Sequence, residues 1–125
     1  MASPKGKQLQ AAWRELMADH ARVNEALERA LQEKHDLSVT EYEVLQRLVE
    51  TRDGKRRMQE LAEEIHLSQS ALSRLVARLE QSGLITREMC DHDRRGIWAS
   101  VTDAGREAEK EAGPTQREVL AATLR

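Results

Sequence analysis

The feature that most constrains this chain is a change of hydrophobic period at Gly83. Before it, two helical stripes are separated only by His66 and Leu67. After it, residues 85–89 and 97–101 alternate apolar and polar side chains, the period of a strand. The sequence therefore predicts two closely linked helices followed directly by a β-hairpin. The stripes are Met58, Leu61, Ala62 and Ile65 in the first helix, and Leu72, Leu75, Val76 and Leu79 in the second.

A longer helix is predicted from Gln8 to Glu33. Its apolar residues recur at steps of three and four, with His20 at the one remaining position. A heptad-like stripe of this length needs a partner along the whole helix, so we expect part of it to lie in a homodimer interface. An amphipathic helix that closes its own core is the alternative. The stripe consists of Leu9, Trp13, Leu16, Val23, Leu27 and Ala30.

Capping signals place two further helices. Ser38 to Glu41 has the form of a capping box and opens a helix that runs to about Thr51, where Asp53-Gly54 indicates a turn. Thr102 can cap a last helix. We expect Gly113-Pro114 to interrupt that helix before the final apolar segment, because proline removes a helical hydrogen bond.

The fold class predicted is mainly α with a small β-hairpin wing, a winged helix-turn-helix, and 125 residues suit one domain. We expect an N-terminal dimerisation helix in 1–36, a DNA-binding lobe in 37–101 and C-terminal dimerisation helices in 102–125. No apolar run reaches the roughly 18 residues of a membrane span, and no secretory signal precedes Gln10, so a cytoplasmic location is expected. Cys90 is the only cysteine and cannot form an intrachain disulfide.

The second helix of the pair carries a face suited to a DNA major groove. Arg74 is the candidate for guanine and Gln69 for adenine, since both side chains can make two hydrogen bonds to one base. Ser68 and Ser70 lie at the predicted helix N-terminus, where backbone N–H groups favour a phosphate. A solvated helix face is the alternative, although it would carry more Glu and Lys. The outward residues are Gln69, Ser70, Ser73, Arg74, Ala77 and Arg78.

The hairpin tip, residues 91–96, carries two arginines. One of Arg94 and Arg95 can enter a minor groove while the other meets phosphate. Asp93 can hold a guanidinium in position by a two-pronged hydrogen bond. A solvated charged turn remains an equal alternative for this tip.

The overall charge does not by itself favour a polyanion, because the chain carries a net charge of −2. Between Ser68 and Arg95 five arginines stand against four acidic residues. The attraction to DNA must therefore come from arginines that face the duplex and carboxylates that face away from it. Binding should then weaken steeply with salt. Only two Trp, one Tyr and no Phe are present, so a base-stacking platform for single strands is not expected.

Several of these segments together resemble the MarR-type (multiple antibiotic resistance regulator) transcriptional regulators, from Trp13 to about Leu120. The resemblance implies a homodimer with intertwined terminal helices and two winged helices on a pseudo-palindromic duplex. It further implies Asp93 and Arg95 as the wing's anchor and minor-groove contact, and Ser68, Gln69, Ser70, Ser73 and Arg74 as the major-groove face. The matching segments are Leu61-Ala62-Glu63, Leu67-Ser68, Ser73-Arg74-Leu75-Val76, Arg78-Leu79-Glu80, Gly83-Leu84-Ile85 with Arg87, Asp93-Arg94-Arg95-Gly96 and Thr102-Asp103-Ala104-Gly105-Arg106.

Two departures from the family pattern carry expectations of their own. Family members often have glycine at the position of His66, so the angle of this turn should differ slightly. The sequence also stops at Arg125, short of the long final helix usual in the family, so we expect a smaller interface or a truncated chain.

Other chemistry is not favoured. Glu88, Asp91 and Asp93 disfavour a reactive thiolate at Cys90. The four histidines lack the spacing of metal ligands on one helix, and no phosphate-binding loop or nucleophile motif occurs, so we predict no cofactor, no metal and no enzyme activity.

The function predicted is a ligand-responsive repressor that binds double-stranded DNA as a homodimer. A winged-helix module that binds protein instead of DNA is the alternative. Trp13 and His20 are the candidates to line a pocket for a small aromatic or anionic effector, with a satisfied interface histidine as the simpler interpretation of His20.

Overall fold

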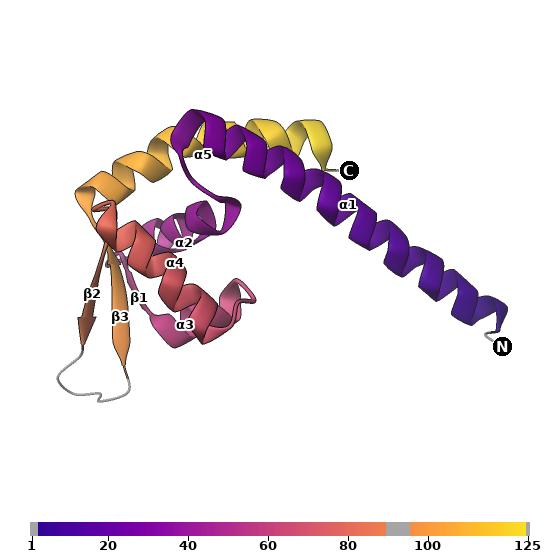
Figure 1. The fold of residues 1–125 in the computed structure, drawn as a ribbon, viewed down its shortest axis with the longest axis horizontal. Coiled ribbons are helices and arrows are strands. Elements are labelled where there is room, and N and C mark those ends of the chain that lie inside the picture. Colours follow the sequence, from indigo (N-terminus) through magenta and orange to yellow (C-terminus); the bar gives the residue numbers. More distant parts are fainter. Residues whose placement is uncertain (1–2, 90–95, 125) are drawn as a thin grey trace.

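The computed structural model describes residues 3–89 and 96–124, and it has the mainly α architecture with a winged helix-turn-helix that the sequence predicts (Figure 1). A lobe built from α2, α3, α4 and the strands lies below two longer terminal helices. In chain order the elements are α1 Pro4–His35, α2 Val39–Glu50, β1 Lys55–Arg57, α3 Met58–Glu64, α4 Gln69–Gln81, β2 Ile85–Met89, β3 Ile97–Val101 and α5 Asp103–Thr123.

The turn between α3 and α4 places the second helix of the pair. His66 adopts a left-handed backbone conformation there, with φ 59°, so this histidine takes a conformation that glycine adopts more easily. Ser68 then caps α4, because its Oγ accepts a hydrogen bond from the backbone N–H of Ala71 at 3.1 Å. The apolar stripe of α4 is buried in the core, as its spacing predicts.

A three-stranded antiparallel sheet, in the order β1-β3-β2, closes the lobe. The hairpin of β2 and β3 is confirmed, with Arg87 opposite Ala99 and Met89 opposite Ile97. The strand β1 was not predicted, because Lys-Arg-Arg shows no apolar alternation. Its strand conformation comes from pairing with β3, where Arg56 lies opposite Ala99.

The helix α1 has two halves with different surroundings. Its C-terminal half lies beside α5 and buries Val23, Leu27 and Leu31. Its N-terminal half projects as an arm away from the lobe, and every residue from Lys7 to Ala21 is exposed (Figure 1). The interpretation of α1 as a helix that closes its own core therefore holds only for the C-terminal half.

The helix α5 is continuous, so the predicted interruption at Gly113-Pro114 is wrong. Ala112 and Gly113 are buried, and a Cβ on Gly113 would lie 3.5 Å from the hydroxyl oxygen of Tyr42. The helix therefore continues through these buried residues, although Pro114 has no N–H to donate. Pro114 lies inside the helix, and Figure 1 shows that α5 changes direction along its length.

The start of α5 is fixed to the connection between α4 and β2. Thr102 caps the helix, as predicted, by accepting from the N–H of Gly105 at 3.0 Å. The same hydroxyl donates to the carbonyl oxygen of Gly83 at 2.7 Å, and the Thr102 N–H donates to Leu84. Thr102 thus hydrogen-bonds the start of α5 to the connection between α4 and β2.

Candidate nucleic-acid interface

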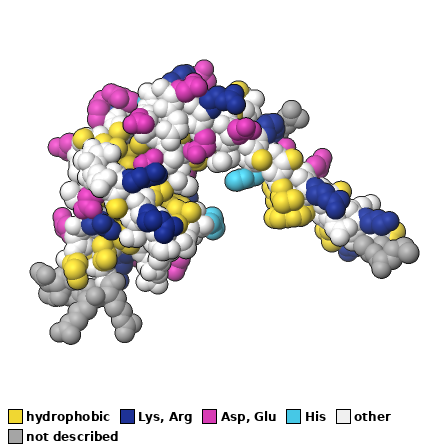
Figure 2. All heavy atoms as spheres, in the orientation of Figure 1, with side chains coloured by type: hydrophobic (Ala, Val, Ile, Leu, Met, Phe, Trp, Pro, Cys, Tyr) yellow, Lys and Arg dark blue, Asp and Glu magenta, His cyan; other side chains and the backbone are white. Residues whose placement is uncertain are grey.

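The outer face of α4 is the centre of the candidate interface. Gln69, Ser70, Arg74 and Arg78 are exposed, while Ser73 and Ala77 are half-buried. These side chains lie opposite the buried stripe of the helix, which is what an amphipathic helix of this sequence requires. Figure 2 shows Lys and Arg side chains on the face of the lobe where α4 lies in Figure 1.

The two arginines of α4 differ in their partners. The guanidinium of Arg78 lies 3.8 Å from the carboxylate of Glu41 on α2. Arg74 has no hydrogen bond or ion pair with any residue in 3–89 or 96–124. Both arginines line a hollow of about 510 Å³ together with Thr40 and Ala71. Arg74 is therefore the arginine of α4 whose donors are not engaged by the described part of the chain.

The serines at the start of α4 are used locally. Ser68 Oγ accepts the capping hydrogen bond from Ala71 and lies 3.3 Å from Ser70 Oγ. Both serines are exposed. The free N–H groups of the first helical turn lie at this same end of α4, and a helix N-terminus suits a phosphate oxygen.

A residue that sequence reasoning did not select, Arg87 on β2, contacts α4. Its Nε donates to the carboxylate of Glu80 at 3.1 Å, and its terminal nitrogen donates to Ser73 Oγ at 3.4 Å. Ser73 is thus occupied as an acceptor by a neighbouring strand. The alternation of Ile85, Arg87 and Met89 could have shown that Arg87 points to the helix side of the hairpin, but not which side chains it meets there.

The tip of the wing carries three predicted site residues, Asp93, Arg94 and Arg95, and all three lie outside the described residues. On β3, the ring of Trp98 has Lys55 and Arg57 over it, with the cationic groups at 5.8 and 5.2 Å from its centroid. The strand β1 thus brings two further cations to the sheet.

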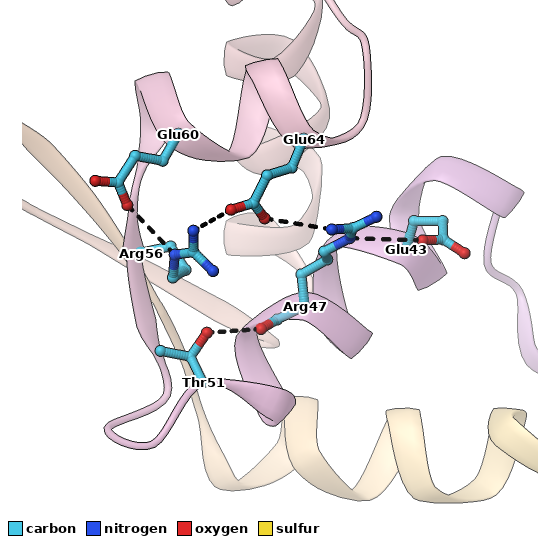
Figure 3. A network of polar contacts seen from close by, with 6 residues as sticks. All are labelled: Glu43, Arg47, Thr51, Arg56, Glu60 and Glu64. Atoms are coloured by element: carbon cyan, nitrogen blue, oxygen red, sulfur yellow. Dashed lines mark hydrogen bonds and ion pairs between the residues drawn. The ribbon is translucent and has the colours of Figure 1, made fainter.

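A polar network joins α2 and β1 to α3 (Figure 3). Arg56 on β1 contacts Glu60 and Glu64 of α3, the former at 3.3 Å. Arg47 on α2 reaches Glu64 at 3.5 Å and Glu43 at 3.9 Å. The pairs are half-exposed, so each contributes little stability alone, but together they tie α2 and β1 to α3.

Trp13 and His20, the predicted effector residues, lie together on the arm. With Leu16 and Met17 they line an open hollow of about 510 Å³. A second hollow of about 390 Å³ lies where α1 passes the start of α2 and the end of α5. Its lining consists of Leu16, Asp19, His20, Arg22, Val23, Asn24, Leu27, Val39 and Leu124.

No helix in residues 3–89 and 96–124 is both long and apolar enough to cross a bilayer. No three His, Cys, Asp or Glu side chains in these ranges are grouped so that they could hold a metal ion.

The chain is similar to known transcription regulators. The family model described as MarR family matches residues 35–96. Two Streptomyces coelicolor structures each share 30% identity with this chain over 99% of its length: AbsC, a MarR family transcriptional regulator (TM-score 0.87, 81% of that chain), and Sco3205, another member, in complex with DNA (TM-score 0.88, 76% of that chain).

A curated relative, the HTH-type transcriptional regulator MhqR of Bacillus subtilis, is 33% identical over 72 residues. The match covers 58% of this chain and 48% of that relative. The chain spans about half the length of the curated relatives it matches.

Proposed function

Because the chain belongs to the MarR family of transcriptional regulators, we propose that it acts as a repressor that binds a pseudo-palindromic duplex as a homodimer and occludes a promoter. The observation that carries this proposal is the exposed, small-residue face of α4, with Arg74 unpaired among the described residues. A similar chain, Sco3205, has been crystallised with DNA.

The recognition helix α4 lies in the major groove in this proposal. Arg74 donates two hydrogen bonds to a guanine, and Gln69 pairs with an adenine nearer the helix start. Ser68 and Ser70 bind a phosphate together with the first N–H groups of α4. Arg78, held toward Glu41, contributes less than Arg74.

The wing contacts the same duplex one groove away. Arg94 and Arg95 bind the minor groove and a phosphate, with Asp93 orienting a guanidinium. Lys55 and Arg57, beside Trp98, add positive charge on the sheet. The acidic balance of the chain makes this local arrangement of cations the source of attraction to DNA.

The homodimer is proposed from the arm of α1. Leu9, Trp13 and Leu16 are 64%, 59% and 61% exposed, which is unusual for a stripe of large apolar residues on one helix face. A second copy that covers this stripe, with residues 1–36 and 102–125 forming the dimerisation part, would remove the stripe from water. The two recognition helices would then lie about 34 Å apart, one helical turn of DNA.

A small-molecule effector is proposed for the hollow between α1, α2 and α5. Its lining is mainly apolar and includes His20 together with Arg22, which is paired with Asp19 at 3.1 Å, a composition that fits a small aromatic ligand. Such a ligand would change the angle between the arm and the lobe, and hence the spacing of the two recognition helices.

The test is a selection from random duplex DNA, followed by a salt titration of the enriched duplex. We expect a pseudo-palindrome whose affinity falls by about a thousandfold between roughly 50 and 200 mM salt, if the dimer meets six or more phosphates. Arg95→Ala should weaken binding to that duplex.

Two arginines one turn apart on α4 provide a matched comparison. Arg74→Ala should cost about 1–3 kcal/mol and relax the preference at one base position, since it removes a bidentate contact. Arg78→Ala should cost less. A folded, dimeric chain that enriches no sequence would contradict DNA binding and favour a protein-binding winged-helix module instead.

A further inference from the structure

The side chain of Arg87 leaves the wing strand toward the recognition helix. Arg87 lies opposite Ala99 in the sheet, and Ala99 is fully buried against the helices. The Arg87 side chain is 30% exposed, and both of its hydrogen-bond partners within residues 3–89 and 96–124 are on α4. Arg87 therefore connects two elements that the proposed function needs at the same time.

The two partners are far apart along the helix. Ser73 and Glu80 are seven residues, or about two turns, apart, which is roughly 10 Å of helix. Because one guanidinium bonds both side chains, it attaches β2 to α4 at two points along the helix. A planar fork with several fixed donors can do this, while an ammonium group acts as a point charge.

The contact also affects charge. Glu80 is exposed on α4, and a free carboxylate there would repel the phosphates of a bound duplex. The ion pair with Arg87 at 3.1 Å compensates that charge. Two nitrogens of the Arg87 guanidinium, Nε and one terminal nitrogen, are thus bonded to side chains of α4.

We propose that Arg87 is a positioning residue of the DNA interface: through Ser73 and Glu80 it holds the wing at the angle to α4 at which both elements bind one duplex. This inference rests on the proposed function. It assigns to Arg87 no contact with DNA.

Arg56 offers a matched control. It lies opposite Ala99 from the other side, on β1, and its side chain is 28% exposed, close to the 30% of Arg87. Like Arg87 it bonds two side chains of one helix, Glu60 and Glu64, but that helix is α3 (Figure 3). Arg56→Ala therefore measures what the loss of a similar arginine does to the fold alone.

The experiment compares two duplexes of equal length, the one enriched from random DNA and an unrelated one. We expect Arg87→Ala to lower affinity for the enriched duplex about tenfold, the size expected for a partly exposed charged hydrogen-bond pair. Affinity for the unrelated duplex should change by about twofold or less, and the slope of log K against log salt should stay the same. Arg87→Lys should restore part of the loss, and Arg56→Ala should leave the ratio of the two affinities unchanged.

A double variant tests whether Arg87 acts through its partner. If it does, Arg87→Ala should cost clearly less in a Glu80→Gln background than in the wild type, because the two changes break one contact. Additive losses would contradict the proposal.

Four other outcomes would also overturn it. A salt slope reduced by about one per protomer, with weaker binding to both duplexes, would make Arg87 a phosphate contact. Equal loss of the affinity ratio in Arg87→Ala and Arg56→Ala would indicate a general effect on the fold. Wild-type protein that binds the enriched duplex, with Arg87→Ala indistinguishable from it, would refute this inference alone. Wild-type protein that enriches no duplex would refute the proposed function and this inference with it.

Discussion

Gly105 lies in the first turn of α5, where the helix passes the connection between α4 and β2. A Cβ at this position would collide with the carbonyl oxygen of Leu84, and it would lie 2.7 Å from a methyl carbon of Val101. A backbone carbonyl cannot move away from the added Cβ as easily as the end of a flexible side chain can. We therefore expect Gly105→Ala to destabilise the protein by about 1–3 kcal/mol, the range for an overpacked core, in urea unfolding.

Gly113 supplies the control for this prediction. A Cβ there would lie 3.1 Å from the guanidinium of Arg117, the far end of a flexible side chain, and 3.5 Å from the Tyr42 hydroxyl. Gly113→Ala should therefore cost less than Gly105→Ala, and the gain in helix propensity offsets part of the cost. Equal losses in the two variants would show that the contact with Leu84 is not what excludes a side chain at position 105.

Tyr42 makes the stability of the folded chain depend on pH in the alkaline range. Burial in the core, and after it the negative charge of Glu109, raise the pKa of Tyr42 from 10.0 to about 12. The unfolded chain therefore loses this proton at lower pH than the folded chain does, and stability falls as pH rises from 10 toward 12.

Comparison with Tyr42→Phe isolates this contribution, because both proteins carry the same lysines. The free energy of unfolding, measured in urea across this range, should decline more steeply for the wild type than for Tyr42→Phe. Parallel declines would mean that Tyr42 ionises equally easily in the folded and unfolded states.

At the scale of elements, α2 depends on its N-terminal cap. Ser38 Oγ accepts from the N–H of Glu41 at 3.1 Å, and the Glu41 carboxylate accepts from the N–H of Ser38 at 2.8 Å. Ser38→Ala removes the first of these bonds and should cost about 1 kcal/mol of unfolding free energy. Thermal unfolding measures it, with Glu50→Ala as the control, since Glu50 is exposed at the other end of α2. Similar losses in both variants would contradict a specific role for the cap.

The elements that could be predicted are those whose signals are local. The caps at Ser38 and Thr102, and the stripe of α4, each lie within a few residues of what they determine. The two errors are tertiary in origin. The strand β1 pairs with β3, and α5 continues through Pro114 at the point where Ala112 and Gly113 are buried in the core region.

The candidate site divides in the same way. The exposed face of α4 follows from helical periodicity, and so Gln69, Ser70 and Arg74 lie where they were expected. The contact of Arg87 with Ser73 and Glu80 joins residues of two elements. The geometry of this contact depends on how the hairpin packs against α4, and the hydrophobic periodicity of a single element does not predict that packing.

At the scale of the whole molecule, the arm of α1 contrasts with the rest of the structure. The lobe has one continuous core that includes Leu31 from α1 and Ala112 from α5. The arm adds no buried residue N-terminal to Val23. The apolar residues of the arm, Leu9, Trp13 and Leu16, therefore add little to the stability of a single copy. Their exposed apolar surface favours contact with a second copy.

Leu16 is the position at which this argument can be tested, because it lies on the stripe and is 61% exposed. We expect the wild type to sediment as a dimer at micromolar concentration and Leu16→Ser to shift toward monomer, since a serine removes apolar area from the contact. Arg14→Ser, on the same exposed arm but off the stripe, should leave the dimer intact.

The monomer released by Leu16→Ser should keep a cooperative unfolding transition, because the described core does not include Leu16. It should bind half of the pseudo-palindrome weakly and lose the affinity that simultaneous binding of two half-sites provides. If Leu16→Ser instead lost its folded structure, the stripe would be needed within one copy. If it stayed dimeric with unchanged affinity, the dimer contact would lie elsewhere than on the arm.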